Sequence, residues 1–363
     1  MARVTGLAAA LLLIMAVIAV ASPARAADAQ WPNIPGETRW PTAEAQGARW
    51  PSVPGQASQW PDVFRTPSVS AFTGELGLRY WFSWAKTGKS LYDPTGADLV
   101  SRLRYEGMHG HAVEGFGRFD HTSGFYTKGY VGGGLLLNGT LNDEDFPPLT
   151  TPYSSTMSDQ KSGGLSYASV DAGFNVVRTP DFRLGAFAGY HYFNERINAF
   201  GCNQIATNAD ICGTFPVPGS IKVITQDNTW QSLRVGADFD VRITDRLSLR
   251  GDAAYLPYVW LNGTDSHWLR IGTAPGDFTG GVPEDGKGRG YQFEAALSYA
   301  VSENASVAVG GRLWHMDSKG DTHFENHIVG FTASPQPVNW KTDIVGVFVQ
   351  GSFKFGPYAT GGL

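Results

Sequence analysis

The segment FRLGAFAGYHYF, residues 182–193, alternates between two kinds of side chain. One set is apolar and the other includes glycine, arginine and histidine: Phe182, Leu184, Ala186, Ala188, Tyr190 and Tyr192 oppose Arg183, Gly185, Phe187, Gly189 and His191. Successive side chains of a β-strand point to opposite faces, so this period of two predicts a strand with one apolar face. The same alternation returns in residues 246–255 and 345–355.

Long strands of this kind, joined by connections that are alternately short and long, are typical of a transmembrane β-barrel. The sequence divides into ten of them: 72–86, 98–121, 125–138, 163–178, 182–198, 221–243, 247–260, 289–301, 305–315 and 340–355. We therefore predict an all-β fold, a ten-stranded antiparallel transmembrane β-barrel with long extracellular loops. The even strand number returns both termini to the periplasm.

The composition agrees with such a barrel and argues against other classes. The chain of 363 residues has 45 glycines and 13% aromatic residues, and only 17% of its residues are charged, against a usual ~25%. The mean hydropathy of −0.18 argues against a protein of many membrane-spanning helices. The formal net charge of −5 and the lack of a basic tract argue against nucleic acid as a partner.

The region before the barrel has two parts. A positive charge, an apolar run and an Ala-Arg-Ala pattern are typical of a cleaved signal peptide. Four Trp-Pro pairs then occur in a stretch without hydrophobic periodicity, which favours an extended chain that is either a spacer or a ligand for a periplasmic partner. The expected organisation is a signal peptide at 1–26, a Pro- and Trp-rich flexible periplasmic arm at 27–70, the outer-membrane barrel at 71–355 and a short C-terminal tail at 356–363.

The chain contains two cysteines, Cys202 and Cys212. Export implies an oxidising environment, and two cysteines ten positions apart most simply close one small loop. We predict a disulfide between them in the third external loop.

Two acidic motifs follow the tetrapeptide Leu-Asn-Gly-Thr, which occurs twice, at the ends of the third and seventh expected strands. Asp143 and Asp145 follow the first copy, and Asp265 and His267 follow the second. Residues two apart on a strand share a face, and these strands lie nearly opposite each other in a ten-strand ring. We expect both pairs to face one another across the barrel mouth.

This arrangement fits hydrolysis of an amide or ester. Asp265 can orient the ring of His267, and the ring can then take a proton from water. Asp143 and Asp145 can hold that water and share charge as the tetrahedral intermediate forms. The alternative is a non-catalytic barrel on the same scaffold, either a porin or a surface-binding protein.

From about residue 72 to 355 the sequence resembles the omptins, a family of ten-stranded outer-membrane endoproteases. The resemblance lies in the segments KTGK at 86–89, DEDF at 143–146, LSYA at 165–168, FRLGAFAGY at 182–190 and DSH at 265–267. It implies that Asp143, Asp145, Asp265 and His267 form the catalytic set of an aspartic-type endopeptidase. It also implies a peptide or protein substrate, a surface-exposed active site in the bacterial outer membrane, and no metal or organic cofactor.

The family pattern is incomplete at two places. Omptins that cut between basic residues line the pocket for the preceding side chain with two acids, and Lys89 and Gly263 stand at those positions here. A neutral or acidic residue before the cut is therefore expected. Omptins also need lipopolysaccharide, an outer-membrane lipid that is bound by three residues spaced two apart. Here Tyr190 matches the first, but Tyr192 and Asn194 stand at the others, so the lipid requirement stays open.

Overall fold

The computed structural model describes residues 71–146, 150–271, 280–326, 331–332 and 334–356. The expected signal peptide, the Trp-Pro arm and nearly all of the expected C-terminal tail lie outside the described residues. The described part of the chain contains no helix that is long and apolar enough to cross a membrane.

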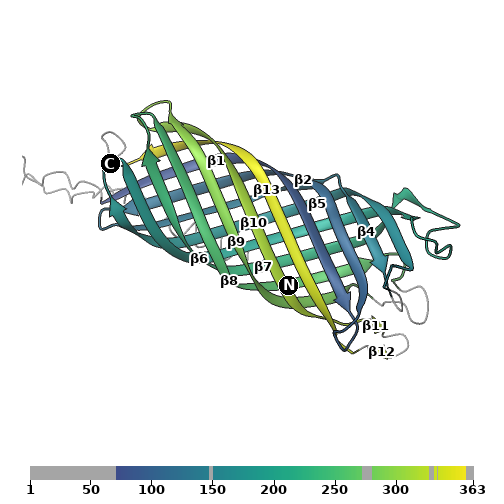
Figure 1. Ribbon diagram of the computed structural model, residues 1–363. Coiled ribbons are helices and arrows are strands. Elements are labelled where there is room, and N and C mark those ends of the chain that lie inside the picture. The colour runs from purple at the N-terminus through teal and green to yellow at the C-terminus, as the bar shows by residue number, and fades with distance from the viewer. Residues whose placement is uncertain (1–70, 147–149, 272–279, 327–330, 333, 357–363) are drawn as a thin grey trace, which may run out of the picture. The chain divides into compact units, whose positions relative to one another are not determined.

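The fold is all-β (Figure 1). Its elements are β1 (Phe72–Tyr92), β2 (Leu99–His121), β3 (Phe125–Leu137), β4 (Thr140–Asp145), β5 (Ser154–Arg178), β6 (Phe182–Gln204), β7 (Val217–Arg242), β8 (Leu247–His267), β9 (Val282–Ala300), β10 (Ala305–Thr322), β11 (Glu325–Asn326), β12 (Phe331–Thr332) and β13 (Gln336–Phe355). The short strands β11 and β12 pair with each other in a separate hairpin.

The remaining strands close into an antiparallel ring, because β1 pairs with both β2 and β13. β3 and β4 share one position in that ring, since each pairs with β2 on one side and β5 on the other. The break between them is at Asn138 and Gly139, whose φ angles of 60° and 104° interrupt the extended backbone. The ten predicted barrel strands are thus confirmed, with the third strand in two pieces.

The outer face of the barrel carries an apolar band. On β1 the exposed apolar side chains include Leu78, Tyr80 and Trp84, and the outward residue after Trp84, Lys86, pairs with Asp343 of β13 at 3.7 Å. Such a band followed by charged residues marks the edge of the hydrocarbon layer. We call the end of the barrel beyond this edge, where the connections after β1, β4, β6, β8 and β10 lie, the loop end, and the opposite end the turn end.

Aromatic side chains fill the lumen just below the loop end. Trp314 lies with its ring centroid 4.8 Å from that of Trp81, 5.1 Å from that of Tyr167 and 4.8 Å from that of His191. All four side chains are buried. The lumen at this level is therefore a packed core.

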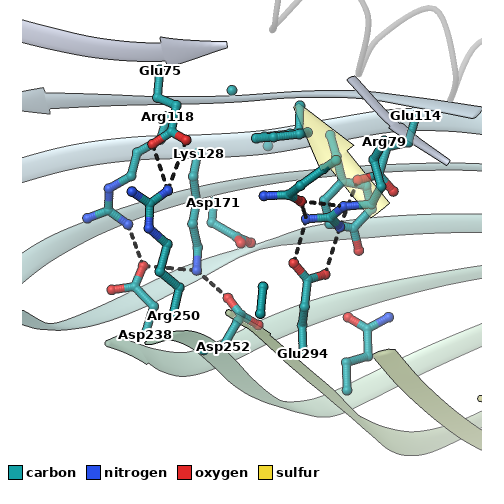
Figure 2. Close-up of a pocket in the computed structure, with 18 of the residues that line it drawn as sticks. Glu75, Arg79, Glu114, Arg118, Lys128, Asp171, Asp238, Arg250, Asp252 and Glu294 are labelled. Atoms are coloured by element: carbon teal, nitrogen blue, oxygen red, sulfur yellow. Dashed lines mark hydrogen bonds and ion pairs between the residues drawn. The ribbon is translucent and has the colours of Figure 1, made fainter. Parts of the chain in front are cut away.

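Charged residues occupy the lumen nearer the turn end and compensate one another. Arg312 donates to Glu114 at 2.6 Å and to Glu294 at 2.8 Å, and Arg79 also donates to Glu294 at 2.9 Å. Figure 2 shows Arg79, Glu114 and Glu294 among the residues that line a cavity of about 160 Å³. Buried charges are tolerated in this way when each is paired and hydrogen-bonded.

The strands extend further at the loop end than the sequence indicates. β8 continues to His267 instead of residue 260, and β9 starts at Val282 instead of residue 289. The first strand likewise runs to Tyr92. The residues expected to begin loops therefore lie on paired strands, which hold them more rigidly than a loop would.

Candidate active site

Asp265 and His267 are the last inward-facing pair on β8, beyond the apolar band. Nε2 of His267 lies 3.0 Å from Oδ2 of Asp265. The Asp265 side chain is 4% exposed and that of His267 is 22% exposed, so the ring can be reached from the barrel mouth. Although burial opposes a charge on the ring, the Asp265 carboxylate raises the pKa of His267 above its usual value.

Asp143 and Asp145 lie on β4, paired in register with Leu103 and Ser101 of β2. Both are partly exposed, and their charges interact with that of His267. Burial raises the pKa of Asp143 to about 7. The positive charge of His267 opposes this rise, and Asp145 and Asp265 add to it. The structure thus brings together the four residues that the sequence indicated for the catalytic set.

Lys89 also belongs to this group. Its buried Nζ donates to Oδ2 of Asp265, the same oxygen that His267 contacts, and to Oε1 of Glu284 at 2.6 Å. The two carboxylates raise the pKa of Lys89, against the effect of burial. Lys89 also lies 5.3 Å from the centroid of the Trp340 ring.

Glu284 is the residue that sequence reasoning missed. It lies on β9 directly opposite Gly263 of β8 and is only 3% exposed. Two other acids nearby, Glu144 on β4 and Asp285 on β9, do not contact Lys89. Glu144 instead pairs with Arg102 at 2.8 Å, and Asp285 neighbours Glu284 on the strand and therefore faces outward. Glu284 lies in the alternating segment 282–294. The glycines at 286 and 288 obscure that alternation, so the sequence predicts a loop up to residue 288.

Polar side chains of β7 hydrogen-bond to Glu284 and to one another. Nε2 of Gln226 donates to Oε2 of Glu284 at 2.9 Å and to Oδ1 of Asn228 at 2.8 Å. A Cβ added to Gly263 would lie 2.8 Å from the same Oδ1 and 3.2 Å from Oε2 of Glu284. A side chain at position 263 would therefore have to displace the side chain of Asn228 or Glu284.

Tyr190 lies on β6, where its hydroxyl donates to Oε1 of Gln231 at 2.6 Å. Glu195 follows on the opposite face, where it is 1% exposed and accepts from Trp230 at 3.1 Å. Glu195 therefore cannot take the place of an outward acid beside Tyr190. Arg196 is exposed and shares the outer face of β6.

Cys202 and Cys212 form the predicted disulfide, with their Cα atoms 5.7 Å apart. Cys202 lies at the end of β6, and Cys212 lies in the connection to β7. Over the described part of the chain, no cluster of three His, Cys, Asp or Glu side chains is arranged to hold a metal ion.

An apolar outer band, a filled lumen and an ionisable group of residues at one mouth define an outer-membrane β-barrel protein with a site at its loop end. Residues 82–334, more than half of the chain, match the model of the Omptin family, and the chain belongs to this family. Omptins are outer-membrane proteases, so the protein is assigned to that class of hydrolases. No curated protein sequence matches it significantly.

A solved structure supports the fold. The outer-membrane protease OmpT from Escherichia coli superposes with a TM-score of 0.66 at 18% identity, over 80% of this chain and 99% of that one. The translocator domain of the autotransporter NalP from Neisseria meningitidis gives a TM-score of 0.30 at 11% identity, over 75% and 87% of the two chains. The second score is too low to indicate a shared fold.

Proposed function

We propose that this protein is an endopeptidase that hydrolyses peptide bonds at the cell surface of a bacterium, with its loop end outside the cell. The observation that carries the proposal is the hydrogen bond between Asp265 and His267 beside the carboxyl groups of Asp143 and Asp145. Export by the expected signal peptide at 1–26 and anchoring through the barrel would present this site to extracellular polypeptides.

In the proposed reaction, a water molecule lies between His267 and the carboxyl pair on β4. Nε2 of His267 is engaged with Asp265, so Nδ1 takes the proton as the water oxygen attacks the peptide carbonyl carbon. Asp265 fixes the orientation of the ring and stabilises the imidazolium that forms. The proton is then delivered to the departing amine when the C–N bond breaks.

Asp143 supplies the second ionisable group of the reaction. With a pKa of about 7 it holds a proton in a large share of molecules near neutral pH, and it can donate that proton to the substrate carbonyl oxygen or to the amine. The reactive state therefore contains one proton shared between Asp143 and His267. More acidic solutions block the base and more alkaline ones remove the acid.

The side chain that precedes the cleaved bond is proposed to enter the pocket beside Lys89 and Gly263. Glu284 supplies one negative charge there, and Lys89 neutralises it. A cationic substrate side chain would have to displace Lys89 or remain unpaired, and an unpaired buried charge costs several kcal/mol. We therefore propose that a neutral side chain is preferred.

The lipid and cofactor requirements follow the family resemblance. We propose that the reaction needs no metal or organic cofactor and that Tyr190 contacts outer-membrane lipopolysaccharide, with Arg196 as the cation on the same face. Assays of the folded protein with and without lipopolysaccharide, in the presence and absence of a chelator, test both parts. For the arm at 27–70 we propose a spacer, with a periplasmic partner as the alternative.

A peptide-library digestion tests the function directly. The full-length protein, in lipopolysaccharide-containing membranes, is incubated with the library, and new termini are identified by mass spectrometry. New termini that Asp265→Asn does not generate would support the proposal. A wild-type protein that yields no new termini would contradict it.

A further inference from the structure

The loop-end site contains a cation that is bound to the proposed catalytic dyad itself. Lys89 of β1 and His267 of β8 both contact Oδ2 of Asp265. Within the described part of the chain, Oδ1 of the same carboxylate is buried without a hydrogen-bond partner. Two donors thus share one oxygen, and the negative charge that Asp265 offers to His267 is divided between them.

Glu284 determines how strongly Lys89 acts on Asp265. Lys89 donates to Glu284 at 2.6 Å, and Gln226 holds the other Glu284 oxygen at 2.9 Å. Lys89, Asp265 and Glu284 are each at most 6% exposed, so water screens their charges weakly. Any change in the charge of Glu284 would therefore reach Asp265 through Lys89.

We propose that Lys89 and Glu284 are positioning residues that set the proton affinity of His267: Lys89 competes with the ring for Asp265, and Glu284 limits that competition by binding Lys89. This inference rests on the proposed function, in which His267 accepts a proton from water. Lys89 weakens the hold of Asp265 on a protonated ring, and Glu284 draws Lys89 away from Asp265. The pair therefore sets the pH at which His267 becomes a neutral base.

Other charged groups face His267 and define the background for this effect. Asp143 and Asp145 face it from β4, and Arg270 follows it in the connection after β8. Tyr105 of β2 lies among Asp143, Asp265 and Glu284. The charge of Lys89 lowers the proton affinity of His267, opposite to the effects of Asp265 and Asp143. Asp143, Asp145, Arg270 and Tyr105 are unchanged in the substitutions below.

The decisive experiment compares Lys89→Met with Glu284→Gln. Removal of the cation is expected to raise the pKa of His267 by about one unit, and removal of the anion is expected to lower it, since a nearby charge shifts a pKa by about 1–3 units. The acid limb of the kcat/KM profile should move in the same two directions. Lys89→Arg should restore most of the wild-type profile.

The pKa is read by NMR titration of histidine labelled at Cε1, with the His267 signal identified by its loss in His267→Gln. This readout does not need activity, so it decides the inference even if the wild-type protein cleaves no peptide, which is the separate failure of the proposed function. Shifts in opposite directions support the inference. Unchanged values, or a shift in the same direction in both variants, overturn it.

If Lys89→Met fails to fold, the double variant Lys89→Met/Glu284→Gln removes both charges and leaves no unpaired carboxylate. In the double variant the pKa of His267 is expected to rise, but by less than in Lys89→Met, because Lys89 contacts Asp265 directly and Glu284 acts from further away. An unshifted or lowered value in a folded double variant would also contradict the inference.

Discussion

Glu284 of β9 lies directly opposite Gly263 of β8, and its carboxylate reaches toward the space that a side chain at position 263 would need. The missing side chain on one strand is thus matched by an acid on the next. Lys89 neutralises that acid from β1. The charged group beside His267 thus joins Lys89 of β1, Asp265 of β8 and Glu284 of β9 through ion pairs.

This pairing predicts a neutral substrate preference. In a peptide set that varies only the residue before the cut, peptides with a neutral residue there should be cleaved at least ~10-fold faster than peptides with Arg or Lys. A buried unpaired charge costs several kcal/mol, and about 1.4 kcal/mol already corresponds to a factor of ten. Lys89→Met should reduce the preference for neutral over cationic peptides, because it leaves Glu284 available to pair with a cationic substrate side chain. Fastest wild-type cleavage after Arg or Lys would contradict the account.

Activity should depend on pH through a bell-shaped profile, because Asp143 has a pKa of about 7 and that of His267 is raised. Asp143→Asn removes a carboxylate that favours the charged ring, so the acid limb should move to lower pH. The loss of the acid should also lower kcat by about 10²-fold. Glu144→Gln is the matched control, because Glu144 pairs with Arg102. An unshifted acid limb in Asp143→Asn would contradict the role given to Asp143.

The filled lumen predicts that the wild-type protein forms no steady ion channel in a planar bilayer. Trp314 packs against Trp81, Tyr167 and His191, and Trp314→Ala should destabilise the barrel by about 3–5 kcal/mol in denaturant titrations. Stable wild-type conductance would favour the porin alternative.

The disulfide closes a connection outside the barrel ladder. Cys202→Ser/Cys212→Ser should therefore leave a folded barrel, with a stability loss of at most about 3 kcal/mol for so short a loop. Intact mass before and after reduction checks the bond, and resistance of the barrel to heating in detergent checks the fold. A variant that no longer folds would show that the connection does more than close a loop.

The sequence predicts the fold well where lipid faces the strands. There, apolar outward residues alternate with inward ones, as in residues 182–193, and ten strands can be read. Beyond Trp84 the outer face turns polar, as at Lys86, and the contrast between the two faces disappears. The strand extensions to Tyr92, His267 and Val282 were therefore read as loops.

Part of the site is also predictable from the sequence. Asp143, Asp145, Asp265 and His267 share a repeated context and an i, i+2 spacing, so their juxtaposition follows from strand order. The ion pairs of Lys89 with Asp265 and Glu284 connect residues 176 and 195 positions apart. Such contacts depend on the ring closure and on how far each strand extends, and local sequence carries no signal of them.

The most direct test of the account compares two histidines that each contact an aspartate. His267 contacts Asp265 at the barrel mouth. His315 contacts Asp343 at 2.6 Å on the outer face, at the loop-end edge of the apolar band. On the best peptide from the library, His267→Ala should lower kcat/KM by at least about 10³-fold, while His315→Ala should stay within about two-fold of wild type, as expected for a surface change. Undiminished cleavage by a folded His267→Ala variant would contradict the central claim.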